Sequence, residues 1–202
     1  MAYPTVAEFA GLMRKQSLEK LVNSHLLTGL PFAFASAPGR YPVMRKVLAE
    51  QLGITVDDIT VVGSGRLGFS LAPDKFGRPF TEQGSDIDTV VVSTRLFDQA
   101  WLELTRKGRS LYGLDQARRE AFVEHRSNNI FFGFMYPDRL AGIISISGQW
   151  FAAFEGLGQE RHLVGLDFEG RLYRSWQHVA VHQLYSLTQI MQTESFRKKY
   201  EI

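Results

Sequence analysis

The feature that most constrains this chain is a pair of acidic residues at the entrance to an apolar strand. Asp86 and Asp88 stand two positions apart in GSDIDTVVVS, and almost every residue after them is apolar. Side chains two positions apart in a strand share one face and lie about 6.5 Å from each other. Two ionised carboxylates about 4 Å apart repel by about 4 kcal/mol at an effective dielectric constant near 20. Mg²⁺ relieves such repulsion, since it takes one or two carboxylates and completes its shell with water and phosphate. The competing interpretation is a solvated turn that Ser85 or Asp86 caps.

A glycine-rich turn precedes the acidic pair along the chain. The apolar segment 59–62 predicts a strand, which runs directly into Gly63, Ser64 and Gly65. Glycine lets backbone N–H groups approach a phosphate closely, and a helix that starts here adds further free N–H groups. The turn lacks the Lys-Ser/Thr of a P-loop and the spacing of a Rossmann fingerprint, so we exclude both motifs. A phosphate cradle followed by a metal-binding strand is the arrangement that phosphoryl transfer requires.

The hydrophobic pattern predicts helices and strands in mixed order. Helices are expected at 5–27, at 42–51 with Gly53 at its end, after Ser93 or Thr94, and at 115–126, 147–157 and 175–192. Strands are expected at 59–62 and 87–93, followed later by a strand pair or bent strand around a Glu169–Gly170 turn. Because no regular strand–helix–strand repeat is present, we predict an α+β fold with a small mixed β-sheet flanked by helices. The whole chain, 1–202, is predicted to be one domain with an N-terminal helical segment 1–52, a core 53–174 and a C-terminal helix 175–202.

Composition excludes several classes of function. The chain has no cysteine, so disulfides, thiolate metal sites and cysteine nucleophiles are absent. Its net charge is +2, and no block of Lys and Arg suggests a footprint for duplex nucleic acid. The N-terminus lacks the order of a signal peptide, and no window approaches about 18 uninterrupted apolar residues. We therefore expect a cytoplasmic protein without a membrane span.

With these residues in place, the chain resembles the DNA polymerase β-like nucleotidyltransferase superfamily. The signature of that superfamily is an apolar residue, Gly, Gly or Ser, a spacer, and then Asp-x-Asp/Glu between apolar residues. The corresponding segments here are VVGS at 61–64 and SDIDTVVV at 85–92. GSGRLGFSLAPDKFGRPFTEQGSDIDTVVVS, LFDQAW and RLYRSW are also similar to an uncharacterised bacterial nucleotidyltransferase-like family. The resemblance implies a sheet of nucleotidyltransferase type with the N-terminal and C-terminal helices packed on it.

The resemblance also implies an activity, namely transfer of NMP from an NTP such as ATP to a hydroxyl group with release of pyrophosphate. Asp86 and Asp88 would hold Mg²⁺ or Mn²⁺. In the superfamily a third carboxylate on a later strand often completes the metal site. We favour Asp167 for this role, because apolar residues flank it as in a strand, and Glu169 is the alternative. The residues implied to contact the nucleotide are Gly63, Ser64, Gly65 and Ser85.

The spacer between Ser64 and Asp86 is longer than is usual in the superfamily. It is filled by KFGRPF, and we interpret it as a flap over the nucleotide. Arg66, Lys75 and Arg78 would then contact phosphate oxygens, with solvated loop charges as the alternative interpretation.

The acceptor stays open at this point. An RNA end, a nucleotide, a protein hydroxyl and a small molecule are all compatible with the motifs, and a partner protein from a neighbouring gene is a further possibility. Two other functions fit the same residues: a nucleotide-binding regulator without catalysis, such as a sensor or an antitoxin, and a bacterial anti-phage defence component that makes a nucleotide signal or modifies RNA. The aromatic run NNIFFGFMYPDRL is interpreted as core and loop, with an aromatic substrate groove as the alternative. His178 and His182 lie four apart on the last helix, but we set a zinc site aside because no third ligand is evident.

Overall fold

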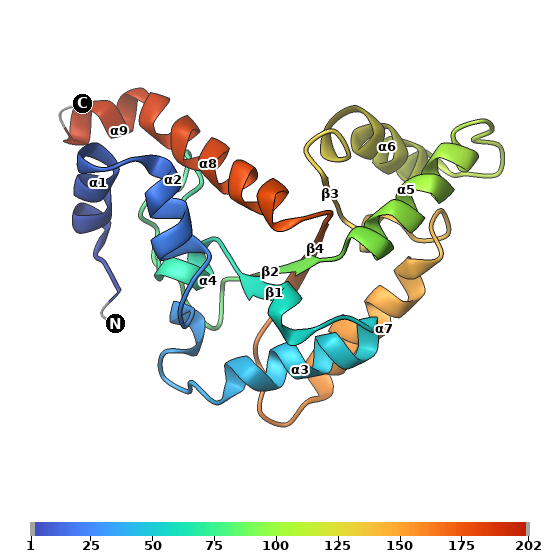
Figure 1. The fold of residues 1–202 in the computed structure, drawn as a ribbon, viewed down its shortest axis with the longest axis horizontal. Coiled ribbons are helices and arrows are strands. Elements are labelled where there is room, and N and C mark those ends of the chain that lie inside the picture. Colours follow the sequence, from blue (N-terminus) through green and yellow to red (C-terminus); the bar gives the residue numbers. More distant parts are fainter. Residues whose placement is uncertain (1–2, 201–202) are drawn as a thin grey trace.

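The computed structural model describes residues 3–200 and shows a mixed α+β fold, which confirms the predicted class (Figure 1). No helix in this range combines the length and apolar character needed to cross a bilayer. The strands are β1 (Ile59–Val61), β2 (Ile87–Val92), β3 (Phe134–Met135) and β4 (Phe168–Tyr173). The helices are α1 (Val6–Lys15), α2 (Leu18–Leu21), α3 (Arg40–Leu52), α4 (Ser64–Leu67), α5 (Thr94–Lys107), α6 (Gln116–Glu124), α7 (Ile146–Gln159), α8 (Trp176–Gln192) and α9 (Glu194–Tyr200).

The four strands form one mixed sheet in the order β1-β2-β4-β3. β2 pairs antiparallel with β1 and parallel with β4, and β3 pairs antiparallel with β4. A parallel pair needs a long crossover, and here it contains α5, α6, β3 and α7. In the register of the parallel pair, Ile87 lies opposite Phe168 and Asp88 lies opposite Glu169. The strand with the acidic pair therefore lies directly beside a later strand with a carboxylate.

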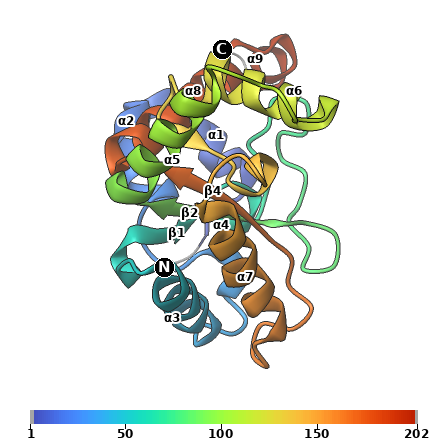
Figure 2. The same cartoon turned by 90° about the vertical axis from the view of Figure 1, so that its right-hand side faces the viewer.

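The two faces of the sheet are covered by different helices. One face carries Ile87, Val91 and Leu172 and packs with α3 and α7 in the main core, below the sheet in Figures 1 and 2. The other face carries Val90 and Tyr173, which pack with apolar residues of α8. Since side chains alternate along a strand, Asp88 projects from the same face as Val90 and lies on the α8 side.

A second apolar cluster joins the two ends of the chain. Helices α1 and α2 pack with α8 and α9, and Figure 1 shows these helices together at one end of the molecule. Phe9 and Ile190 are fully buried in this cluster, and Phe196 of α9 is nearly so. The terminal helices thus form a layer over the α8 side of the fold.

Local capping explains most of the correct helix limits. Ser93, Asp115 and Ser175 each accept a hydrogen bond from a backbone N–H in the first turn of α5, α6 and α8. Gly53 ends α3 in the left-handed conformation, as predicted.

Two expectations about secondary structure were wrong. The helix expected at 5–27 breaks before Ser17, whose side chain caps α2, and the chain then continues as a π-helical turn at Val22–Leu26. The turn expected at Glu169–Gly170 is absent, because both residues lie inside the continuous strand β4. Gly170 is buried there under aromatic rings of α7, so the missing side chain serves packing and does not signal a turn.

Candidate functional site

Asp88 is the central acid of the candidate site. It is the second residue of β2, and its side chain is 26% exposed. Burial raises the pKa of Asp88, the charge of Arg171 lowers it, and the charge of Asp86 raises it again. Burial likewise raises the pKa of Glu169, with further increases from Asp86 and Asp88. Three carboxylates at one end of β2 and β4 therefore repel one another.

Arg171 on β4 partly neutralises these acids. Its Nη2 donates a hydrogen bond to Oδ1 of Asp88 at 3.0 Å. Burial lowers the pKa of Arg171, but attraction to Asp88, Tyr136 and Tyr173 outweighs burial, so the pKa is raised. The Nε of Arg171 is buried and has no hydrogen-bond partner among the described residues. The guanidinium group thus holds Asp88 with one donor and keeps another unused.

The glycine-rich turn approaches Asp88 directly. Gly63 has φ +64°, and a Cβ at this position would collide with Oδ2 of Asp88. The positive φ and the close approach both require glycine here. The N–H of Val62 donates to the carbonyl of Asp88 at 2.9 Å, which holds the turn beside β2. The structure therefore brings the predicted phosphate turn and one of the two predicted acids together.

A cavity of about 480 Å³ opens between this turn and α8. Gly63, Ser64, Asp88 and Arg171 line one side of it. The other side is formed by polar residues of α8, none of which was predicted to belong to the site, although His182 was considered as a zinc ligand. Their spacing places them on one helical face, and this polar stripe inside an otherwise apolar helix was the available signal. The residues that α8 contributes are His182, Gln183, Tyr185, Ser186 and Gln189.

Several predicted site residues lie outside the cavity lining, namely Asp86, which is exposed, and Gly65, Ser85 and Asp167. The hydroxyl of Ser85 accepts a hydrogen bond from the N–H of Thr81 at 3.2 Å in the loop before β2. Asp167 is exposed immediately before β4, and its backbone carbonyl accepts from the N–H of Ile87 at 2.8 Å. Glu169 lies within β4, opposite Asp88, and is the better placed of the two candidate third carboxylates.

The expected flap is anchored away from the cavity mouth. Phe76 packs edge-on against Phe196 and Tyr200, with ring centroids 5.0 and 6.1 Å apart. Lys75 and Arg78 are exposed on this loop and do not line the cavity. Residues 70–73 do line it. The loop therefore supplies one wall of the cavity and does not place its cations over the turn.

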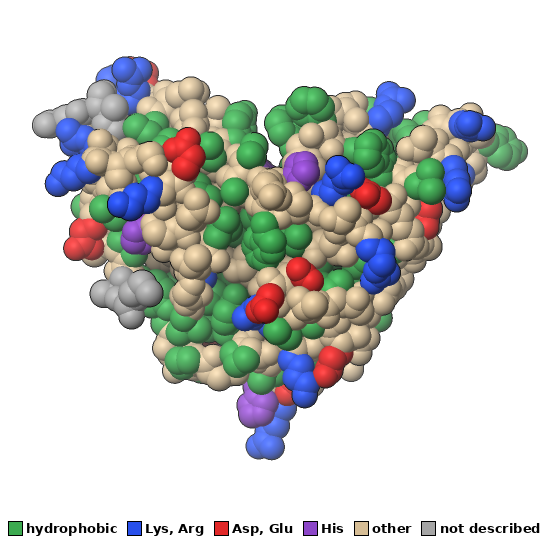
Figure 3. Space-filling model, viewed as in Figure 1, with side chains coloured by type: hydrophobic (Ala, Val, Ile, Leu, Met, Phe, Trp, Pro, Cys, Tyr) green, Lys and Arg blue, Asp and Glu red, His purple; other side chains and the backbone are tan. Residues whose placement is uncertain are grey.

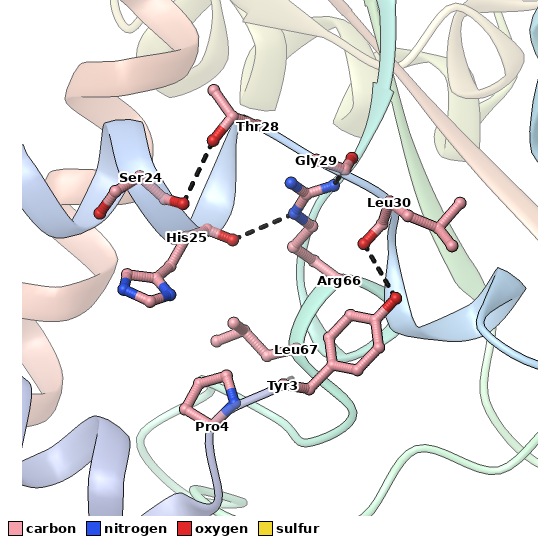
Figure 4. A pocket seen from close by; sticks show the side chains of 9 residues that line it. All are labelled: Tyr3, Pro4, Ser24, His25, Thr28, Gly29, Leu30, Arg66 and Leu67. Carbon is pink, nitrogen blue, oxygen red and sulfur yellow. Dashed lines mark hydrogen bonds between the residues drawn. The ribbon is translucent and has the colours of Figure 1, made fainter. Parts of the chain in front are cut away.

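Arg66 makes structural contacts elsewhere. It is 2% exposed and lines a separate pocket among N-terminal residues (Figure 4). Its Nε donates to the carbonyl of His25 at 3.1 Å, and its Nη1 donates to the carbonyl of Gly29 at 2.8 Å. The structure corrects the expectation that Arg66 contacts phosphate, because its side chain is occupied by the carbonyl groups of His25, in the π-helical turn, and of Gly29, shortly after it.

The carboxylate oxygens of Asp88 and its acidic neighbours are of the ligand type that Mg²⁺ prefers. Burial and mutual repulsion raise the pKa of Asp88 and Glu169, and a divalent cation would offset both effects. Arg171 competes for Oδ1 of Asp88, and within residues 3–200 no group of three or more acidic, His or Cys side chains is arranged to hold a metal. The fit therefore rests on Asp86 and Asp88, with phosphate oxygens to complete the shell.

His182, on the cavity wall, is expected to make stability depend on pH. Burial, with a smaller contribution from the charge of Arg171, lowers its pKa from 6.5 to about 4. Its Nδ1 lies 2.7 Å from the hydroxyl of Tyr173, whose pKa burial raises. Between pH 6.5 and pH 4, His182 is protonated in the unfolded chain but not in the folded one. The contribution of this residue to stability therefore falls as pH drops from 6.5 to 4, and it is constant above this window. The loss for this residue is up to about 3 kcal/mol.

Urea unfolding of the wild type and His182→Gln at a series of pH values would test this expectation. The other buried histidines act equally in both proteins, so the difference between the two curves isolates His182. Parallel curves between pH 4 and pH 6.5 would contradict it.

Compared with models of protein families, with curated proteins and with solved structures, the chain gave no match. Function is therefore inferred from the residues themselves and from their geometry.

Proposed function

We propose that the protein is a metal-dependent nucleotidyltransferase that moves NMP from an NTP to a hydroxyl acceptor. The observation that supports this most is the close approach of Gly63 to Asp88 on the wall of one cavity. A glycine turn suited to phosphate and an acid suited to a cation thus lie side by side. Asp86 and Glu169 add two more carboxylates within electrostatic range of Asp88.

Each group has a role in this reaction. The triphosphate would lie against Gly63 and Ser64, where backbone N–H groups at a helix start have no intrahelical partner. Arg171 adds guanidinium donors that match phosphate oxygens. A divalent cation held by Asp86 and Asp88 would neutralise phosphate charge. The acceptor oxygen bonds to the α-phosphorus, the bond to pyrophosphate breaks, and Glu169, made more basic by its raised pKa, takes the acceptor proton.

A transfer assay tests the proposal. The protein would be incubated with each α-labelled NTP, Mg²⁺ or Mn²⁺, and either purified RNA, nucleosides or cell lysate. Label on one acceptor together with release of pyrophosphate supports the proposal. Calorimetry with the same triphosphates, run in parallel, shows whether they bind.

Glu169 and Asp167 can be separated by matched amide substitutions. Glu169→Gln is expected to lower transfer about 10²-fold or more, because it removes the base. Asp167→Asn is expected to change transfer by no more than about twofold, since Asp167 is exposed and precedes the strand. A large loss in Asp167→Asn with an active Glu169→Gln would reverse this assignment.

One observation favours a second function, a regulator that binds a nucleotide without turnover. Asp88 is already paired with Arg171, so the acid that a cation needs is held by a protein cation. In that case calorimetry would show triphosphate binding, and no acceptor would take up label from any triphosphate. A defence enzyme that makes a nucleotide signal or modifies RNA shares the transfer chemistry and differs only in acceptor.

A further inference from the structure

A second cavity, of about 550 Å³, adjoins the candidate site. It lies between α8 and the segment 128–134, and it shares His182 and Tyr185 with the first cavity. Figure 3 shows the surface hollowed into a notch between the part of the molecule that contains α8 and the part that contains α6 and β3, with apolar side chains on both sides. The two cavities are thus neighbours along one face of α8.

The walls of this second cavity are aromatic and open to solvent. Phe131 is 81% exposed and Tyr185 is 54% exposed. The rings of Phe132 and Tyr185, from opposite walls, lie 6.3 Å apart with a tilt of 30°. Phe134 stacks on His182 with centroids 4.7 Å apart. Large apolar groups gathered on a surface in this way mark binding sites, and their flat faces suit a planar ring.

The wall that carries Phe131 and Phe132 is held in place by His125. Its Nε2 accepts the N–H of Tyr136 at 3.0 Å, and its Nδ1 lies 2.6 Å from the carbonyl of Ala121. Because Nε2 accepts a backbone N–H and Nδ1 faces a carbonyl, the ring is neutral with Nδ1 as the donor, and burial, which lowers the pKa of His125, agrees with this. The cavity is therefore built into the fold before any ligand arrives.

An unpaired polar group lies among these aromatic walls. Asn129 lines the cavity and is 6% exposed, and its Nδ2 is buried without a hydrogen-bond partner among the described residues. An unpaired buried donor costs about 1–3 kcal/mol. A ligand with an acceptor on its edge would satisfy it once rotation of the Asn129 side chain turns Nδ2 toward the cavity. Aromatic faces together with an amide are the groups by which proteins stack unpaired nucleobases and bind their edges.

We propose that this cavity binds the nucleobase of the acceptor, which is either a free nucleoside or the unpaired end of an RNA strand. This inference rests on the proposed function, because His182 and Tyr185 border both cavities and would place the acceptor sugar beside the triphosphate. The neutral state of His182 fits a stacking role. Among the candidate acceptors, this inference favours one that carries a nucleobase over a protein hydroxyl.

Calorimetry without triphosphate or metal tests the cavity directly. Adenosine and uridine are the probes, ribose is the control without a base, and a single-stranded hexaribonucleotide is compared with the same sequence in a duplex. We expect the nucleosides and the single strand to bind, and ribose and the duplex to fail. If the hexamer binds more strongly than either nucleoside, the acceptor is an RNA end. If they bind equally, the acceptor is a free nucleoside.

Two variants with a matched control locate the binding. Phe131→Ala is expected to weaken nucleoside binding about 5- to 150-fold through lost stacking, while Phe151→Ala, which alters an exposed aromatic residue on α7, leaves it unchanged. Asn129→Leu is expected to weaken binding and to raise the unfolding midpoint, because it removes an unpaired buried donor. The inference would be overturned if Phe131→Ala and Asn129→Leu both left nucleoside affinity unchanged. It would also be overturned if the wild-type protein bound no nucleoside.

The acceptor role is tested separately from the chemistry. Adenosine should bind with unchanged affinity when a non-hydrolysable triphosphate saturates the first cavity, and competition between them would overturn the acceptor assignment. Nucleoside binding at this cavity in a protein that transfers no label would leave the cavity in place and reject the proposed function. If the protein instead binds no nucleoside and forms a dimer that Phe131→Ala abolishes, the cavity is a contact between two copies, and the inference is overturned.

Discussion

Asp88→Asn is expected to lower nucleotide transfer about 10³-fold while the protein stays folded. The amide keeps the shape of the side chain but removes the negative charge that would bind the cation. Asp86→Asn together with Asp88→Asn should leave no measurable transfer, since both predicted cation ligands are then neutral. Release of labelled pyrophosphate is the measurement. Unchanged release in the double variant would exclude this site.

The controls must separate lost chemistry from lost structure. Asp74→Asn changes an exposed acid in the 72–80 loop and should leave transfer at the wild-type rate. In Asp88→Asn the partner Arg171 loses its ion pair, so Asp88→Asn with Arg171→Gln is needed to remove both charges together. Both members of the pair are about a quarter exposed, which limits the stability loss on breaking it to about 1–2 kcal/mol. If the variant with Asp88→Asn and Arg171→Gln loses transfer but unfolds at the wild-type midpoint, the defect lies in the chemistry and not in the fold.

Gly170→Val is expected to destabilise the fold by about 3 kcal/mol, a large share of the 5–15 kcal/mol that holds a typical domain together. A Cβ at Gly170 would collide with the ring of Phe154 and lie 2.6 Å from the Cζ2 of Trp150. Trp150 is 2% exposed, so it has no free space into which to move. Gly170 also lies between Glu169 and Arg171, and the variant should lose transfer together with stability. Urea unfolding measures the first effect directly.

Gly148→Ala is the matched control for the packing argument. Gly148 lies on α7, close to Trp150, but a Cβ there meets nothing within 4 Å. Alanine in an exposed helix position should raise stability by up to about 1 kcal/mol. A Gly170→Val protein as stable as the wild type would show that Phe154 and Trp150 can move, and would remove the packing role assigned to Gly170.

The correct sequence predictions depend on neighbours close along the chain. Ser93, Asp115 and Ser175 cap helices because a short polar side chain reaches an N–H two or three residues ahead. The acidic strand was predicted from a run of valines, which favours extended backbone. β3 was missed because two residues are too few to show a period. Gly170 was mistaken for part of a turn because packing against α7 leaves no trace in the residues beside it.

The residues that surround Asp88 come from distant parts of the chain. Local pattern alone defined the glycine turn, the acidic pair and the mixed α+β class, because each depends on backbone preference and on alternation over a few positions. Pairing of β2 with β4 then selected Glu169 and Arg171 as neighbours of Asp88, and the packing of α8 supplied the polar wall. Packing of α4 against the π-helical turn at Val22–Leu26 directed Arg66 to the carbonyl groups of His25 and Gly29. Contacts over more than 80 residues are decided by how apolar faces are buried together, and no short stretch of sequence carries that information.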